Sequence, residues 1–194
     1  MKLAYLRAVS KLVLTVDDAA RALAIRPASA VVFCHRAVKT GELMRLQRNR
    51  YMLRERWEHL SREERWQVAN LLQVPSYISL TTALAYHELT TQAQPAYVES
   101  IAVHRSQVIE VGGTVFKYVK IAPALYFGFV RRDGVFIATP EKALADCMYL
   151  SSLYRYHLDW SSLETSRVNV AVLRRMLRRY PRRTQQWWAA RWKT

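Results

Sequence analysis

The residues best suited to chemistry in this sequence are arginines and short polar side chains near residues 26–50. A guanidinium group bonds two acceptors at once, which matches a phosphate or the major-groove edge of guanine. Serine can likewise bond a phosphate or a base. An ordinary charged surface is the alternative reading of each arginine. The candidates for contact with duplex DNA are Arg26, Ser29, Val32, Arg36, Lys39, Arg45, Arg48, Asn49 and Arg50.

A helix is expected over residues 27–40 to hold four of these candidates. Pro27 suits its first turn, because the missing N–H has no helical partner there, and Gly41 suits a left-handed stop. An apolar stripe at helical spacing leaves Ser29, Val32, Arg36 and Lys39 facing largely outward. The stripe itself consists of Ala30, Cys34, Ala37 and Val38.

Two short strands, over residues 43–46 and 50–53, are expected to follow this helix as a hairpin. Asn49 tolerates the positive φ that its polar turn requires. Two earlier helices are expected over residues 3–14 and 16–23, and Thr15 with Asp18 forms a variant capping box for the second. Helices followed by an arginine-bearing hairpin predict a winged helix-turn-helix. Its helix would enter the major groove, and its wing would lie on the phosphate backbone or in the minor groove.

The charge of the chain is large and unevenly placed. Its formal net charge is +15, which favours a polyanionic partner but does not distinguish DNA, RNA and anionic lipid. Residues 1–56 and 164–194 each carry a net charge of +8, whereas residues 57–163 carry −1. The neutral middle therefore favours a scaffold or a protein contact. The cysteines Cys34 and Cys147 have no metal-like spacing and are expected to be reduced and buried.

The second half predicts an α+β unit. A connecting helix is expected near residues 54–73, with Ser61 and Glu64 as a capping box, and a helix capped by Ser79 near residues 79–89. Alternation predicts a strand at 97–104 and hairpins at 108–121 and 127–138. Thr139 and Pro140 then open a helix to residue 150.

Several motifs of this half resemble the AbiEi-type antitoxin family. They are Tyr77-Ile78-Ser79-Leu80-Thr81-Thr82-Ala83-Leu84-Ala85-Tyr86-His87-Glu88-Leu89, Tyr126-Phe127-Gly128, and Ala138-Thr139-Pro140-Glu141-Lys142-Ala143-Leu144-Ala145-Asp146. Residues 38–43 and 48–53 are similar to the winged helix of that family, except that Asn49 stands where glycine is common. The resemblance covers roughly residues 1–155. It implies a type IV antitoxin that represses its own operon at inverted repeats and counteracts a nucleotidyltransferase toxin.

No catalytic, metal or cofactor site is expected. His87 lies near a helix end, where it can bond carbonyls, and Glu141 and Lys142 are explained by the start of a helix. The other histidines have no ligand spacing, and no glycine-rich phosphate loop occurs. A nuclease with its own DNA-binding domain is the enzymatic alternative, with Asp146 as its testable carboxylate. A regulator without an antitoxin role is the other alternative.

The tail combines an amphipathic helix over residues 168–180 with an arginine- and tryptophan-rich end. The tail has three possible roles: packing on the second domain, extra phosphate contacts, or binding of an acidic protein or an anionic membrane. The arginine- and tryptophan-rich end contains Arg182, Arg183, Trp187, Trp188, Arg191 and Trp192.

The sequence thus predicts an α+β protein that binds double-stranded operator DNA as a repressor and is not an enzyme. The expected domains are a winged helix-turn-helix at 1–56, a connecting helix at 57–75, and an AbiEi-like α+β domain with a small antiparallel sheet and C-terminal helices at 76–194. It is expected to be cytoplasmic with no membrane span, and to act on inverted repeats as a dimer or as cooperative monomers.

Overall fold

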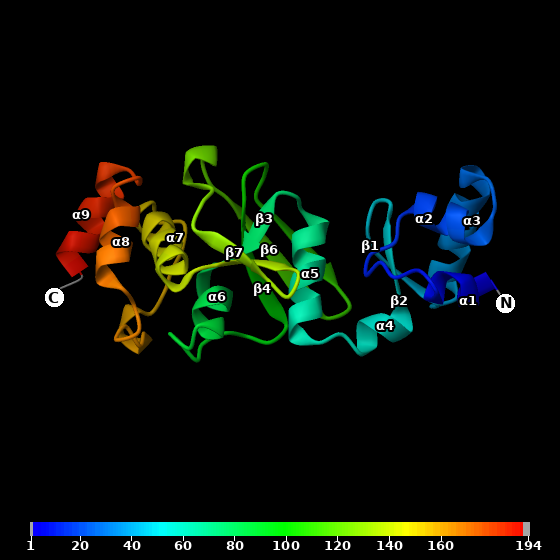
Figure 1. Ribbon diagram of the computed structural model, residues 1–194, viewed down its shortest axis with the longest axis horizontal. Coiled ribbons are helices and arrows are strands. Elements are labelled where there is room, and N and C mark those ends of the chain that lie inside the picture. Colours follow the sequence, from blue (N-terminus) through cyan, green and yellow to red (C-terminus); the bar gives the residue numbers. More distant parts are fainter. Residues whose placement is uncertain (1, 192–194) are drawn as a thin grey trace.

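The computed structural model describes residues 2–191 and arranges them as an elongated row of three parts (Figure 1). An N-terminal unit lies at one end, a larger sheet with its covering helices lies in the middle, and the last two helices lie at the other end. The elements of the N-terminal unit are α1 (Lys2–Arg7), α2 (Val16–Leu23), α3 (Pro27–Lys39), β1 (Leu43–Gln47) and β2 (Arg50–Leu53).

Local capping signals set the helix boundaries of this unit. Thr15 accepts from the Asp18 backbone N–H, and the Asp18 carboxylate accepts from the Thr15 N–H at 2.9 Å, so the predicted capping box is confirmed. The first helix is shorter than expected. It ends at Arg7, and Leu14 instead exchanges two backbone hydrogen bonds of 2.8 Å with Tyr51 of β2. That long-range pairing supersedes the helical spacing of the segment.

The expected connecting helix is broken into α4 (Arg54–Glu58) and α5 (Arg62–Leu72). The Ser61–Glu64 capping box is present and starts α5, because its two reciprocal bonds satisfy N–H groups that have no helical partner. The helix α5 also packs on the larger sheet: the Tyr118 hydroxyl donates to the Ala69 carbonyl at 2.6 Å. It is therefore part of the sheet's core as well as a connection.

The larger sheet is mixed, which corrects the expectation of an antiparallel one. Its strand order is β5-β6-β4-β3-β8-β7, with β4 parallel to β6 and β3 parallel to β8. The pairing of β3 was missed because a strand of three residues shows no periodicity, and the pairing of β4 with β6 was missed because it passes over the intervening β5, which no local pattern indicates. The strands are β3 (Ser76–Ile78), β4 (Tyr97–Ala102), β5 (Gln107–Val111), β6 (Thr114–Lys120), β7 (Phe129–Arg132) and β8 (Val135–Ala138).

Helices cover the two faces of this sheet. The helix α5 lies on one face, and α6 (Leu80–Tyr86) and α7 (Pro140–Ser152) lie on the other (Figure 1). Thr139 caps α7 as predicted. Ser79 occupies the N-cap position of α6, but its hydroxyl makes no capping bond, which corrects that detail. Two helices, α8 (Val170–Leu177) and α9 (Arg182–Arg191), pack beyond α7, and short 3-10 turns are formed by Pro123–Leu125 and Trp160–Ser162.

The hairpin β1–β2 lies between two hydrophobic cores. Leu43, Tyr51 and Leu53 point into the core of the N-terminal unit. Met44 and Met52 point the other way and join the core that continues through Trp57 and Trp66 to the sheet. Because strand side chains alternate, one short hairpin serves both cores.

Candidate nucleic-acid interface

The outward face of α3 is the best-formed candidate surface of the N-terminal unit. Three small side chains, Ala30, Cys34 and Ala37, are at most 2% exposed and seat the helix. The opposite face is uncovered: Ser29, Val32, Arg36 and Lys39 are all exposed, as the stripe predicted. Among residues 2–191, no side-chain hydrogen bond or ion pair holds these four.

Two neighbouring valines were not both expected on this surface. Val31 and Val32 are each 50% exposed, although valine is usually buried. Only Val32 was among the predicted residues, because Val31 falls off the outward spacing. Exposed valine on a helix that enters the major groove can contact the methyl group of thymine. The apolar residues in the first turns of the helix were the signal in the sequence from which this exposed apolar surface could have been predicted.

The hairpin presents fewer free groups than its sequence indicates. Arg45 and Arg48 are exposed, and Asn49 adopts the expected positive φ of 57°. The Asn49 side chain, however, accepts a hydrogen bond of 2.9 Å from the Val16 N–H at the start of α2. Arg50 is half-buried, and its guanidinium donates to the Leu71 carbonyl near the end of α5. Asn49 and Arg50 thus have structural partners, whereas Arg45 and Arg48 are exposed.

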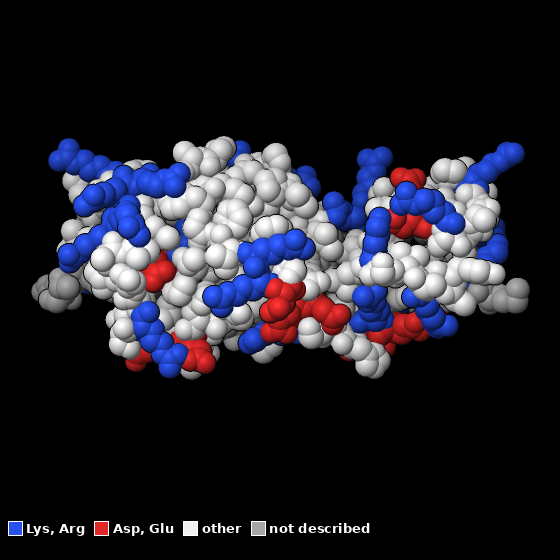
Figure 2. All heavy atoms as spheres, in the orientation of Figure 1, with Lys and Arg blue, Asp and Glu red and all other residues white. Residues whose placement is uncertain are grey.

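Basic side chains gather over both ends of the molecule on the face that Figure 2 shows. Arg26 is also exposed, at the N-cap position of α3 without a side-chain capping bond. A helix N-terminus with free N–H groups attracts phosphate, and an arginine there adds to that attraction. The N-terminal unit therefore joins an open helix face to a surplus of positive charge.

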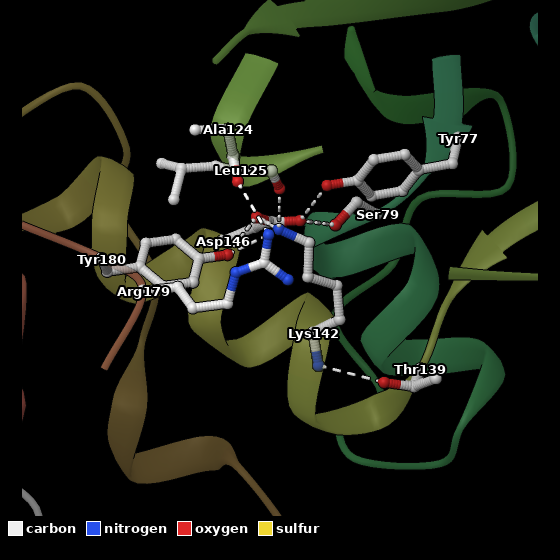
Figure 3. A network of polar contacts seen from close by, with 9 residues as sticks. All are labelled: Tyr77, Ser79, Ala124, Leu125, Thr139, Lys142, Asp146, Arg179 and Tyr180. Atoms are coloured by element: carbon white, nitrogen blue, oxygen red, sulfur yellow. Dashed lines mark hydrogen bonds and ion pairs between the residues drawn. The ribbon is translucent and has the colours of Figure 1, made fainter. Parts of the chain in front are cut away.

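A buried polar network occupies the junction of sheet, α7 and tail (Figure 3). Lys142 and Asp146, one turn apart on α7, have fully buried side chains joined by a 2.6 Å ion pair. The Tyr77 and Ser79 hydroxyls donate to one carboxylate oxygen, each at 2.9 Å. The Tyr180 hydroxyl donates to the other oxygen, also at 2.9 Å.

This network holds the fold and is poorly placed for metal-dependent cleavage. Every group around the carboxylate is a donor within the protein, and Lys142 also donates to the Leu125 carbonyl at 2.8 Å. Burial lowers the pKa of Lys142, while the charge of Asp146 opposes that shift. Burial, and then the charge of Asp146, raises the pKa values of Tyr77 and Tyr180 well above the usual range. Within residues 2–191, no group of three or more His, Cys, Asp or Glu side chains is placed to hold a metal ion.

The other expected residues are accounted for by structure. The ring of His87 bonds a carbonyl as expected, but that carbonyl belongs to Ala138 at the end of β8, at 2.8 Å, and not to a helix end. Both cysteines are free and buried. On α8, Leu173 and Leu177 are buried and the arginines face outward, which agrees with packing of the tail on the second unit. Trp192 lies outside the described residues.

Comparisons with known proteins identify a shared fold. No family model matches this chain, and no curated protein matches it. Among solved structures, the chain is similar to the RV2827C protein from Mycobacterium tuberculosis, with a TM-score of 0.59 and 14% sequence identity. The likeness covers 96% of this chain and 72% of that one. Over the described residues, no helix is both long and apolar enough to cross a bilayer.

Proposed function

We propose that this protein binds double-stranded operator DNA through α3 and the arginines of the β1–β2 hairpin, as a winged helix-turn-helix repressor. The observation that carries the proposal is the open outward face of α3, on which Ser29, Val32, Arg36 and Lys39 are all exposed. The helix packs through its small residues Ala30, Cys34 and Ala37 and is rimmed by cations, and the major groove is wide enough to admit an α-helix. Arg45 and Arg48 then reach the flanking phosphates or the minor groove.

The hairpin contacts limit how the protein docks. Because Arg50 and Gln47 donate to carbonyls near the end of α5, the hairpin is held against the sheet unit and approaches DNA together with it. Inverted repeats would place two copies on one operator, as a dimer or as cooperative monomers.

Binding to DNA from the region upstream of its own gene tests the proposal. Operator affinity is measured by fluorescence anisotropy at several salt concentrations for the wild type, Arg36→Ala and Arg105→Ala. An Arg36 that reads a base contributes ~1–3 kcal/mol and a preference at one position, both lost in Arg36→Ala. Arg105, exposed on the sheet unit, is the matched control. Equal affinity of all three proteins for operator and unrelated duplex would refute sequence-specific binding by α3.

The finer proposal, an antitoxin that counteracts a nucleotidyltransferase toxin, is supported by the resemblance of residues 77–89 and 138–146 to the AbiEi-type family. Co-expression with a nucleotidyltransferase encoded beside it should restore growth. Rescue that persists in Arg36→Ala would separate the antitoxin activity from repression. Absence of rescue by the wild type would leave a regulator without an antitoxin role.

A further inference from the structure

A long groove runs over the side of the molecule where the chain passes from α7 towards the tail. It consists of three adjoining hollows with volumes of about 430, 590 and 230 Å³. Arg155, Tyr156 and His157 line both the first and the second hollow. Trp160, Trp187 and Arg191 line both the second and the third. The shared walls place the three hollows next to one another along one stretch of the surface.

Aromatic rings and cations alternate along this groove. Lys117 Nζ lies 5.8 Å from the ring centre of Tyr97 and 5.4 Å from that of Tyr156. Farther along, the Arg191 guanidinium lies 4.4 Å from the ring centre of Trp187. The rings of Trp187 and Trp160 lie 4.9 Å apart, so neither is a loose surface side chain.

A second arginine–aromatic pair stands beside the groove. The Tyr154 side chain is 89% exposed, next to Arg155, and the Arg183 guanidinium lies 5.2 Å from its ring centre. An aromatic ring left so far in water contributes little to the fold. Its exposure makes it available to a planar ligand.

The negative charges of the groove are mostly engaged by the protein itself. Glu99, at the floor, is only 4% exposed. It accepts from the Tyr156 hydroxyl at 2.6 Å and pairs with Lys117 at 3.4 Å. Asp159 accepts from the Ser161 backbone N–H at 3.0 Å. Arg155, Arg183 and Arg191 are exposed and have no carboxylate partner among the described residues, so the free charge along the groove is positive.

We propose that this groove binds a single-stranded nucleic acid of a few nucleotides. Bases of a single strand can stack on Tyr154, Trp160 and Trp187, while its phosphates contact the arginines between them. A duplex hides its bases inside the stack and cannot use these rings. A membrane would favour a protruding apolar face, whereas here Tyr154, Trp160 and Trp187 line a hollow together with arginines. The site is separate from the α3 surface, so the inference does not rest on operator binding.

The salt dependence of binding separates stacking from phosphate contact. Anisotropy of labelled oligo-dT and oligo-U, each of about eight nucleotides, is measured with the full chain at several salt concentrations. Tyr154→Ala should weaken binding at least about fivefold and leave the salt slope unchanged, because it removes a stacked base and no ion pair. Arg155→Ala and Arg191→Ala should each weaken binding and reduce the slope by about 0.7.

Two control variants test whether these effects are specific to the groove. Arg105→Ala removes an exposed arginine outside the groove and should change neither affinity nor slope. Arg36→Ala, on α3, should leave single-strand binding intact. The proposal is overturned if neither oligonucleotide binds in the micromolar range, or if Tyr154→Ala and Arg191→Ala bind as Arg105→Ala does. Binding of phosphatidylglycerol vesicles in place of both oligonucleotides would also overturn it and assign the groove to lipid.

Discussion

The ion pair of Lys142 and Asp146 is the most constrained feature of this protein at the scale of single residues. Both side chains are fully buried, and each needs the other, because an unpaired charge in the interior is very unfavourable. Tyr77 and Ser79, from the segment that joins β3 to α6, and Tyr180, from the tail, complete the shell. The pair therefore ties the sheet, α7 and the tail together at one point.

Replacing Lys142 by methionine should lower the free energy of unfolding by ~3–5 kcal/mol, because it leaves the Asp146 carboxylate buried without a cation. The double variant Lys142→Met with Asp146→Leu should lose less than the sum of the single changes, since no buried charge remains. Urea unfolding at neutral pH measures the loss in Lys142→Met, in Asp146→Leu and in the double variant. Lys120→Met, at an exposed lysine, is the control and should stay within ~0.5 kcal/mol. Additive losses would contradict the coupling.

His87 gives a prediction for pH. Its burial lowers the pKa in the folded state, although the Ala138 carbonyl and the charge of Glu141 favour the charged ring. As the pH falls below the ordinary histidine pKa of about 6.5, the unfolded state takes up this proton first. The contribution of His87 to stability is thus complete above that pH and is lost below it. Between pH 7.5 and 5, urea midpoints should fall less in His87→Gln than in the wild type. His104→Gln, at an exposed histidine, should follow the wild type.

At the scale of elements, the turn between β5 and β6 supports the junction of the two units. Gly112 has a φ of +53°, and a Cβ there would lie 2.2 Å from Trp57 Nε1. The Trp57 indole N–H donates to the Gly112 carbonyl at 3.3 Å. Its ring also packs edge-on against Phe116, with centres 6.2 Å apart. The indole therefore has little freedom to move away from an added methyl group.

Gly112→Ala and Gly113→Ala form a matched pair. Gly113 also has a positive φ, of +73°, but an added Cβ would meet nothing within 4 Å. Gly113→Ala should cost only the backbone strain, ~1–2 kcal/mol. Gly112→Ala should cost that amount and a further ~1–3 kcal/mol for overpacking against Trp57. Thermal unfolding measures the difference between them. Equal losses would show that the turn is free to shift away from α4.

Local signals explain which elements the sequence could predict. The capping residues Thr15, Ser61 and Thr139 and the left-handed Asn49 depend on neighbours within three or four positions, and all were found in the predicted places. The pairing of Leu14 with Tyr51 depends on folding at long range. The three-residue strand β3 is too short to show a period.

The candidate interface divides in the same way. The open face of α3 follows from the spacing of apolar residues in one helix, and the sequence sufficed to find it. The partner of Arg50, the Leu71 carbonyl, lies on another element. The sequence therefore could not show that Arg50 is engaged within the protein. The groove residues Tyr97, Tyr154 and Trp187 are distant in sequence, and only the fold brings them to one surface.

At the scale of the whole molecule, the continuous core decides how the units behave. The core that contains Met44, Leu46 and Met52 from the hairpin also contains Trp57, Trp66 and the sheet. If the two units separated, these side chains would be exposed to water, and each Å² of apolar surface so exposed would cost about 25 cal/mol. The two units should therefore not unfold independently.

The expected result is a single cooperative transition in urea. Residues 1–56 contain no tryptophan, so tryptophan fluorescence reports the rest of the chain, whereas far-ultraviolet circular dichroism reports helices in both units. The two probes should give the same midpoint. Leu43→Ala, in the N-terminal core, should destabilise by ~2–5 kcal/mol and move the fluorescence midpoint as far as the dichroism midpoint. Leu71→Ala, at a side chain 40% exposed, is the mild control. A dichroism curve that splits while the fluorescence midpoint stays in place would mean that the hairpin detaches from α5, which would leave Arg50 free to bind phosphate.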